Sequence, residues 1–164
     1  MKKIVILTIF MATALFSEEL RVKSKSFNAD QKKGISIFEG TVNVIKGNDE
    51  LNASRVTIYT DAEQKPIKYI AEGNASFSVL TEEKALYVGK AQKVVYIPEV
   101  KEYYFYQSVH LKQINERKEI IGDEVVLKTI EGKAYANSVK DEPVVMIFDM
   151  PEEKEKKKKS NKEK

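Results

Sequence analysis

The chain has no cysteine, no tryptophan and a single histidine among its 164 residues. The absence of cysteine excludes disulfides, thiolate metal sites and acylation of an N-terminal cysteine, so packing alone must hold the fold together. A body of about 130 residues is large enough to build such a core. With one histidine, a zinc site would need clustered carboxylates, and the sequence clusters none.

Catalytic motifs are also missing. The sequence contains neither a nucleophile elbow nor a glycine-rich phosphate loop. The lone His110 falls on the polar phase of its predicted strand and is expected to face solvent. Two acidic pairs, Asp61/Glu63 and Glu82/Glu83, lie in predicted turns, where solvated carboxylates are the ordinary interpretation. We therefore predict a protein that is not an enzyme and has no catalytic residue, metal or cofactor.

One long hydrophobic run is present, at residues 4–16, directly after two lysines. Thirteen residues are too few to span a bilayer as a helix, and the pattern is typical of a secretory signal peptide. We expect a signal peptide over residues 1–17, cleaved after Ala14 or after Ser17, and a mature domain over residues 18–150. The alternative is an uncleaved membrane anchor.

Positive charge is concentrated at the two ends of the chain. The net charge is +3, of which residues 1–17 contribute +2 and residues 151–164 contribute +3, so the body carries −2. A body without excess positive charge is a poor nucleic-acid binder, and we predict no such partner. Residues 151–164 contain no apolar side chain that could offset the entropy of ordering, so we expect a disordered, Lys/Glu-rich tail.

Apolar residues recur at every second position between residues 20 and 148. A period of two places these side chains on one face of a pleated strand. No segment shows a sustained 3.6-residue period with caps, so we predict no long helix in the mature domain. The predicted fold class is all-β, with strands expected over residues 21–27, 35–39, 41–46, 51–60, 67–80, 85–97, 101–113, 119–128, 133–139 and 144–148.

Turn signals and a weak repeat organise these strands. Residues 28–34, 47–50, 61–66 and 81–84 are polar turns, and Gly40 and Gly73-Asn74 predict kinks inside strands. Residues 53–59 (ASRVTIY) resemble residues 91–96 (AQKVVY), and residues 122–127 (GDEVVL) form a looser third copy. Either any meander repeats itself in this way, or similar strand-turn units stack as rungs of one sheet.

The inward-facing residues are large, which leaves two interpretations of the interior. If two sheet layers pack face to face, these residues fill the space between them as an ordinary core. If the layers splay apart, the same residues line an apolar groove that can hold acyl chains. The alternating pattern is identical in both cases.

Several ordered segments resemble the OstA/LptA family. They are residues 38–44 (FEGTVNV), 51–59 (LNASRVTIY), 70–77 (IAEGNASF), 91–96 (AQKVVY) and 121–125 (IGDEV), and the likeness covers most of residues 22–128. Mild departures occur at Ser54, where the family commonly has Asp, and at Tyr106-Gln107, where Thr-Gly or Ser-Gly is common. The resemblance implies an open β-jelly roll of stacked antiparallel strands.

The resemblance also implies a function. Members of this family form a periplasmic bridge for lipopolysaccharide, carry its lipid A acyl chains in an apolar interior, and join head to tail between inner- and outer-membrane components of the transport machinery. It implies a periplasmic location with contacts to both membranes. Under this interpretation the lipid-binding side chains, taken by strand phase, are Val22, Ile35, Ile37, Val44, Val56, Ile58, Phe77, Tyr96, Tyr104, Tyr106 and Leu111.

The last predicted strand supports assembly through its edge. It carries no lysine, so an unpaired edge there would promote aggregation unless a partner strand covers it. We therefore expect an assembly edge at Val144, Val145, Met146, Ile147 and Phe148, although this strand could instead pair internally. Two other functions remain open: the inner-membrane-anchored component of the same pathway, and a β-sandwich scaffold that binds protein and no lipid.

Overall fold

A computed structural model describes residues 19–139 and 142–150 of the chain, and these form an all-β structure. The signal peptide and tail predicted for residues 1–17 and 151–164 lie outside the described residues. Within the described part there is no helix long and apolar enough to cross a membrane. The strands are β1 (Leu20–Lys23), β2 (Ser26–Asp30), β3 (Ile35–Lys46), β4 (Asp49–Thr60), β5 (Pro66–Leu80), β6 (Leu86–Ile97), β7 (Glu102–Gln113), β8 (Lys118–Lys128), β9 (Lys133–Asn137) and β10 (Val145–Phe148).

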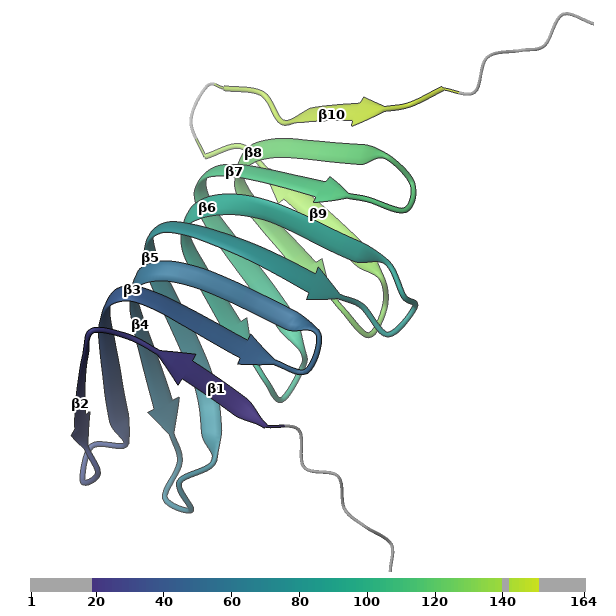
Figure 1. The fold of residues 1–164 in the computed structure, drawn as a ribbon. Helices are drawn as coiled ribbons and strands as arrows, with labels where there is room; N and C mark the ends of the chain where they lie inside the picture. Colours follow the sequence, from purple (N-terminus) through teal and green to yellow (C-terminus); the bar gives the residue numbers. More distant parts are fainter. Residues whose placement is uncertain (1–18, 140–141, 151–164) are drawn as a thin grey trace, which may run out of the picture.

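The strands stack in chain order as one antiparallel sheet that does not close on itself (Figure 1). Strands β3 to β8 each pair with the next along the chain. At one end of the stack, β1 and β2 both pair with β3; at the other, β9 and β10 both pair with β8. The all-β, open jelly-roll prediction is confirmed.

Each long strand bends near its middle, and the bend divides the sheet into two facing sides. On β3, β5 and β7 the bend is a pair of residues with positive φ: Gly40-Thr41, Gly73-Asn74 and Gln107-Ser108. The kinks predicted at Gly40 and Gly73-Asn74 are therefore present. At Gly73 a side chain would also collide with Ser54 of β4, since a Cβ there would lie 2.7 Å from the Ser54 side chain.

The weak sequence repeat marks the bend on the alternate strands. On β4 the inward phase passes from Ala53 to Val56, and on β6 from Ala91 to Val94, a step of three residues in place of two. On β8 the third copy places Gly122 before the bend and buried Val125 after it. The repeated Ala-x-x-Val spacing thus lets both sides of a bent strand present apolar residues to one interior, which favours stacked rungs as its explanation.

We call the two facing parts of the sheet the β1 side and the β2 side. Their interior faces meet in one hydrophobic core, in which Phe105, Leu111 and Leu127 are fully buried. Burial of each such side chain is worth roughly 1.5–3 kcal/mol. By strand pairing, the β1 side comprises residues 20–23, 42–46, 49–53, 75–80, 86–91, 109–113, 118–122 and 145–148, and the β2 side comprises residues 26–30, 35–39, 55–60, 66–72, 93–97, 102–106, 124–128 and 133–137.

The N-terminal segment differs from the sequence prediction. One strand was expected over residues 21–27 and a polar turn over residues 28–34, but the segment forms two strands, β1 and β2, and β2 continues to Asp30. The reason lies at the bend of β3, where the Lys25 N–H donates to the carbonyls of Glu39 and Gly40, each at 3.0 Å. The chain therefore crosses the bend and pairs with β3 on both sides of it.

Candidate functional site: the apolar interior and the ends of the stack

Most of the side chains predicted to point inward do so. Val56, Ile58, Phe77 and Leu111 are buried in the core, and the half-buried Val22, Val44 and Tyr96 pack against it. They come from both the β1 side and the β2 side, so the interior has apolar walls on two opposed faces.

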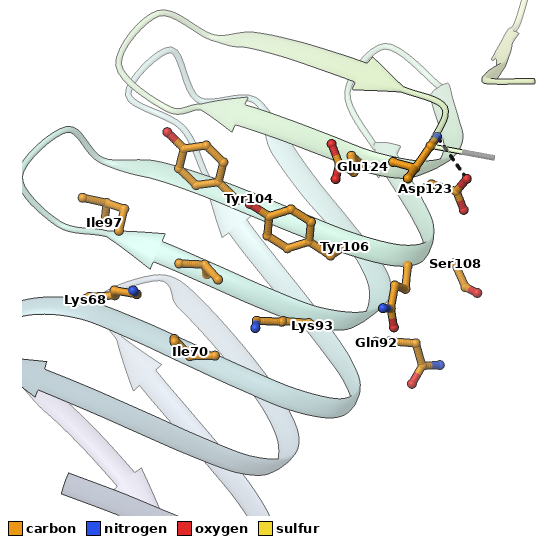
Figure 2. Close-up of a pocket in the computed structure, with 13 residues that line it drawn as sticks. Lys68, Ile70, Gln92, Lys93, Ile97, Tyr104, Tyr106, Ser108, Asp123 and Glu124 are labelled. Carbon is orange, nitrogen blue, oxygen red and sulfur yellow. Dashed lines mark hydrogen bonds between the residues drawn. The ribbon is translucent and has the colours of Figure 1, made fainter. Parts of the chain in front are cut away.

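Tyr104 and Tyr106 were predicted to point inward, and this was wrong. On β7 the positive-φ pair keeps the strand phase unchanged, so the interior residues are Tyr103 and Phe105 before the bend and Val109 after it. Tyr104 and Tyr106 consequently lie on the outer face (Figure 2). The segment Tyr-Tyr-Phe-Tyr is aromatic in both phases, so alternation alone could not choose between them.

The same reasoning corrects the prediction for Ile35 and Ile37. β3 holds one phase through its bend, with Phe38 packed against the core and Val42 buried in it. Ile35 and Ile37 alternate with Phe38 and therefore lie on the outer face, where they pair with Tyr59 and Thr57 of β4.

An aromatic ladder crosses the interior, and most of it was missed from sequence. The ring of Tyr96 stacks on that of Tyr103 at a centroid distance of 4.3 Å, and Phe77 stacks on Phe105 at 4.2 Å. Tyr103 and Phe105 lie 6.1 Å apart, and Tyr69 is 5.8 Å from Tyr96. The Ala91-to-Val94 step could have identified which residues of β7 face the interior. Val94 faces the interior and pairs with Phe105, so Phe105 must face the interior too.

The interior contains a small cavity toward the N-terminal end of the stack. Its volume is about 60 Å³, and its walls are mostly apolar, including Leu20 and Val44 from the β1 side and Tyr69 and Tyr96 from the β2 side. This is far below the roughly 300–1,000 Å³ of pockets that hold small molecules. A larger ligand can enter only if the two sides move apart.

The outer face carries a larger hollow of about 960 Å³ over β5 to β8 (Figure 2). Its floor includes Tyr104 and Tyr106, and charged residues such as Lys93 and Glu124 lie among the apolar ones. The Tyr104 hydroxyl donates to the Glu102 carboxylate at 2.5 Å, and this hydrogen bond, with a second from Lys128, holds the pKa of Glu102 below its usual range. A charged, open surface of this kind suits acyl chains less well than the interior does.

Polar contacts join the rims of the β1 side and the β2 side. The buried Tyr103 hydroxyl donates to Asp49 at 2.8 Å, and burial, with the neighbouring Asp49 carboxylate, raises the pKa of Tyr103 far above its ordinary value. Lys101 forms an ion pair with Glu82 at 2.6 Å. The Lys46 ammonium lies 5.6 Å from the centre of the Tyr96 ring, within reach of a cation–π interaction.

Apolar side chains are exposed at both ends of the stack, on strands that are paired along one edge only among the described strands. At the N-terminal end, Phe27 of β2 is 60% exposed although it lies beside Phe38 on the interior face. At the C-terminal end, Val144 packs against the core, whereas the four residues of β10 are 42–51% exposed. β10 pairs internally with β8, yet it is also the last strand in the sheet order, so its other edge has no partner among the described strands.

Groups that could hold a metal do not occur among residues 19–139 and 142–150, where no three His, Asp or Glu side chains converge. His110 lies on the outer face with its side chain 41% exposed, and its Nε2 is 2.7 Å from Glu119. Lys112 pairs with the same carboxylate at 2.9 Å. These three side chains form a hydrogen-bonded cluster on the outer face.

The open stack of bent strands around an apolar interior defines an open β-jelly roll. A family model described as "LptA/(LptD N-terminal domain) LPS transport protein" matches residues 21–133. The chain therefore belongs to this family of lipopolysaccharide transport proteins, which is not a family of enzymes.

Comparison with solved structures gives the same fold. The chain is similar to LptH from Pseudomonas aeruginosa, described as "the LptA homologous periplasmic component of the conserved lipopolysaccharide transport device", with a TM-score of 0.71. The match covers 81% of this chain and 96% of LptH at 18% sequence identity, a level at which the likeness establishes the fold alone. A search of curated proteins found no match.

Proposed function

We propose that this protein binds lipopolysaccharide by its lipid A acyl chains, in the interior between the β1 side and the β2 side. One observation carries the proposal: the interior is apolar along the stack and reaches exposed apolar residues at both ends. Acyl chains leave water for such a lining with a gain of about 0.8 kcal/mol per buried methylene. Family membership supports the same ligand.

We further propose that subunits join head to tail, in a periplasmic bridge from the inner-membrane to the outer-membrane components of the transport machinery. The ends of the stack differ in shape. The N-terminal end presents the bulky Phe27 on β2, and the interior face of β9 presents the small Ala134 and Ala136. Strand addition between unlike edges is heterologous, so it propagates into a filament and does not close as a two-fold dimer.

A protein-binding scaffold is the second candidate function, and one observation favours it. Much of the interior is tightly packed, with Phe105, Val109 and Leu127 at 0% exposure. A sealed core binds nothing, so in that case function would rest on the outer surfaces and edges. The two candidates differ in whether lipid reaches the interior.

Substitutions at two neighbouring positions of β4 separate the candidates. Leu51 faces the interior and lines the cavity, whereas Asn52 is exposed on the opposite phase. Leu51→Asp should weaken the binding of lipopolysaccharide to purified protein at least about 10-fold, because a charge in an apolar lining opposes acyl chains. Asn52→Asp adds the same charge outside and should leave the affinity unchanged. Equal affinities for folded Leu51→Asp and wild type would favour the scaffold.

A further inference from the structure

A partly buried hydrogen bond joins the rim of the β1 side to that of the β2 side at one point of the stack. Asp49 begins β4, and Tyr103 lies at the start of β7, 54 residues later. The Tyr103 hydroxyl donates to Asp49 Oδ2 at 2.8 Å, and Asp49 Oδ1 accepts the Leu80 N–H at 2.9 Å. Tyr103 is 7% exposed and Asp49 is half-buried, so the hydrogen bond is partly shielded from bulk water.

Neighbouring contacts reinforce this tie. The Lys101 ammonium pairs with Glu82 at 2.6 Å, and the Glu82 N–H donates to the Thr129 carbonyl at 3.2 Å. The Thr129 hydroxyl in turn donates to the Lys101 carbonyl at 2.7 Å. Turns from both sides of the sheet are therefore joined beside Tyr103.

Tyr103 lies at the far end of the N-terminal cavity along the stack. It lines the cavity together with Leu51 and Tyr96, and no lining residue comes from β8, β9 or β10. Its ring centroid is also 6.1 Å from that of Phe105, a fully buried residue of the same strand. A chain that entered the cavity from the N-terminal end would therefore meet the Tyr103 ring, held in place by Asp49, before it could reach Leu127 on β8.

We propose that the Asp49–Tyr103 hydrogen bond is a latch that limits how far an acyl chain penetrates the interior. With the latch closed, chains occupy the N-terminal cavity; chains pass Tyr103 toward the C-terminal end only when the two rims separate. This inference rests on the proposed lipid binding and adds to it the residue pair that controls depth. Carriage from one end of the stack to the other then requires the latch to open.

The experiment maps the depth of an acyl chain directly. Purified full-length protein is mixed with lipid A that carries a diazirine at the end of one acyl chain, irradiated, and the adducts are located by peptide mass spectrometry. In the wild type, we expect adducts on cavity residues such as Val44 and Leu51 and few beyond Tyr103. In Tyr103→Phe, which keeps the ring and removes the donor, adducts on Leu127 should increase roughly 10-fold.

Tyr104→Phe is the matched control, because it also removes a tyrosine–carboxylate hydrogen bond, at 2.5 Å to Glu102, but on the outer face. Its adduct map should equal that of the wild type. Asp49→Asn, which removes the charge of the acceptor, provides a second test and should shift adducts in the same direction as Tyr103→Phe. Circular dichroism confirms that each variant is folded.

The outcomes separate the latch from the function on which it rests. Identical adduct maps for the wild type, Tyr103→Phe and Asp49→Asn would overturn the latch and leave lipid binding in place. Wild-type adducts already abundant on Leu127 would also overturn it. Absence of interior adducts in every protein would overturn lipid binding, and the latch with it.

Discussion

Removal of the Phe77 ring should cost more stability than removal of any exposed aromatic residue. The ring is 5% exposed, stacks on Phe105 at 4.2 Å and lines the interior cavity. Phe→Ala substitutions in cores cost about 3–5 kcal/mol, and domains of this size are stable by about 5–15 kcal/mol. We therefore expect Phe77→Ala to fold, with its melting temperature lowered by roughly 10–20 °C.

Urea unfolding followed by tyrosine fluorescence measures this loss, since the chain has eight tyrosines and no tryptophan. The midpoint should fall while the slope with denaturant stays constant. Phe27→Ala is the control: its ring is 60% exposed and contacts Phe38, so its removal should cost below about 1 kcal/mol. Equal losses for the two variants would refute the close packing of Phe77 in the interior.

The same variant links stability to ligand binding. The missing ring enlarges the cavity that we propose holds an acyl chain, and a ligand that binds the folded state stabilises it by mass action. Saturating lipopolysaccharide should therefore raise the melting temperature of Phe77→Ala by more than that of the wild type. An equal rise in both proteins would place the bound lipid elsewhere.

Three further predictions concern packing, titration and assembly. Gly89→Ala would place a Cβ against the His110 carbonyl and 2.8 Å from the Phe77 ring, so it should lower the free energy of unfolding by about 1–3 kcal/mol. Gly122→Ala is the control, because its Cβ would have its nearest contact at 3.5 Å and should change the free energy of unfolding little. Urea unfolding measures both variants. Tyr104→Phe should raise the pKa of Glu102 toward its ordinary value in an NMR titration. Because folding lowers this pKa, ionised Glu102 contributes stability above its unfolded-state pKa, and this contribution fades as the pH falls through its folded-state pKa. An unchanged pKa in the variant would assign the shift to Lys128 instead. Deletion of residues 143–150, or Val145→Pro in β10, should shift concentrated protein from oligomers toward monomer, as measured by light scattering. The β-sheet signal in circular dichroism should be retained. Oligomers of unchanged size would place the contact elsewhere.

Much of the fold follows from the sequence because alternation and turn residues act locally. Most of the strands, most of the turns between them and the bends at Gly40 and Gly73-Asn74 were predicted from residue type. The bend at Gln107-Ser108 was not, because neither residue is a glycine, although both have positive φ. The split between β1 and β2 was missed because it depends on hydrogen bonds from Lys25 to the bend of a different strand.

The site was harder to predict than the fold. Strand phase is easy to assign where polar and apolar residues alternate, as in Phe77, and ambiguous where both phases are apolar, as on β7. A phase error of one residue placed Tyr104 and Tyr106 in the interior, whereas they lie on the outer face. The Asp49–Tyr103 contact joins residues far apart in the chain, and only the folded arrangement of turns brings them together.

Site-specific photo-crosslinking in cells tests the central claim, that lipopolysaccharide occupies the interior. A benzophenone amino acid is placed at Val44, which is half-buried on the interior wall, or at Tyr106, which lies in the larger outer hollow. We predict a lipopolysaccharide adduct from position 44 and none from position 106. An adduct from position 106 alone would show that lipid uses the outer face, and would contradict binding in the interior.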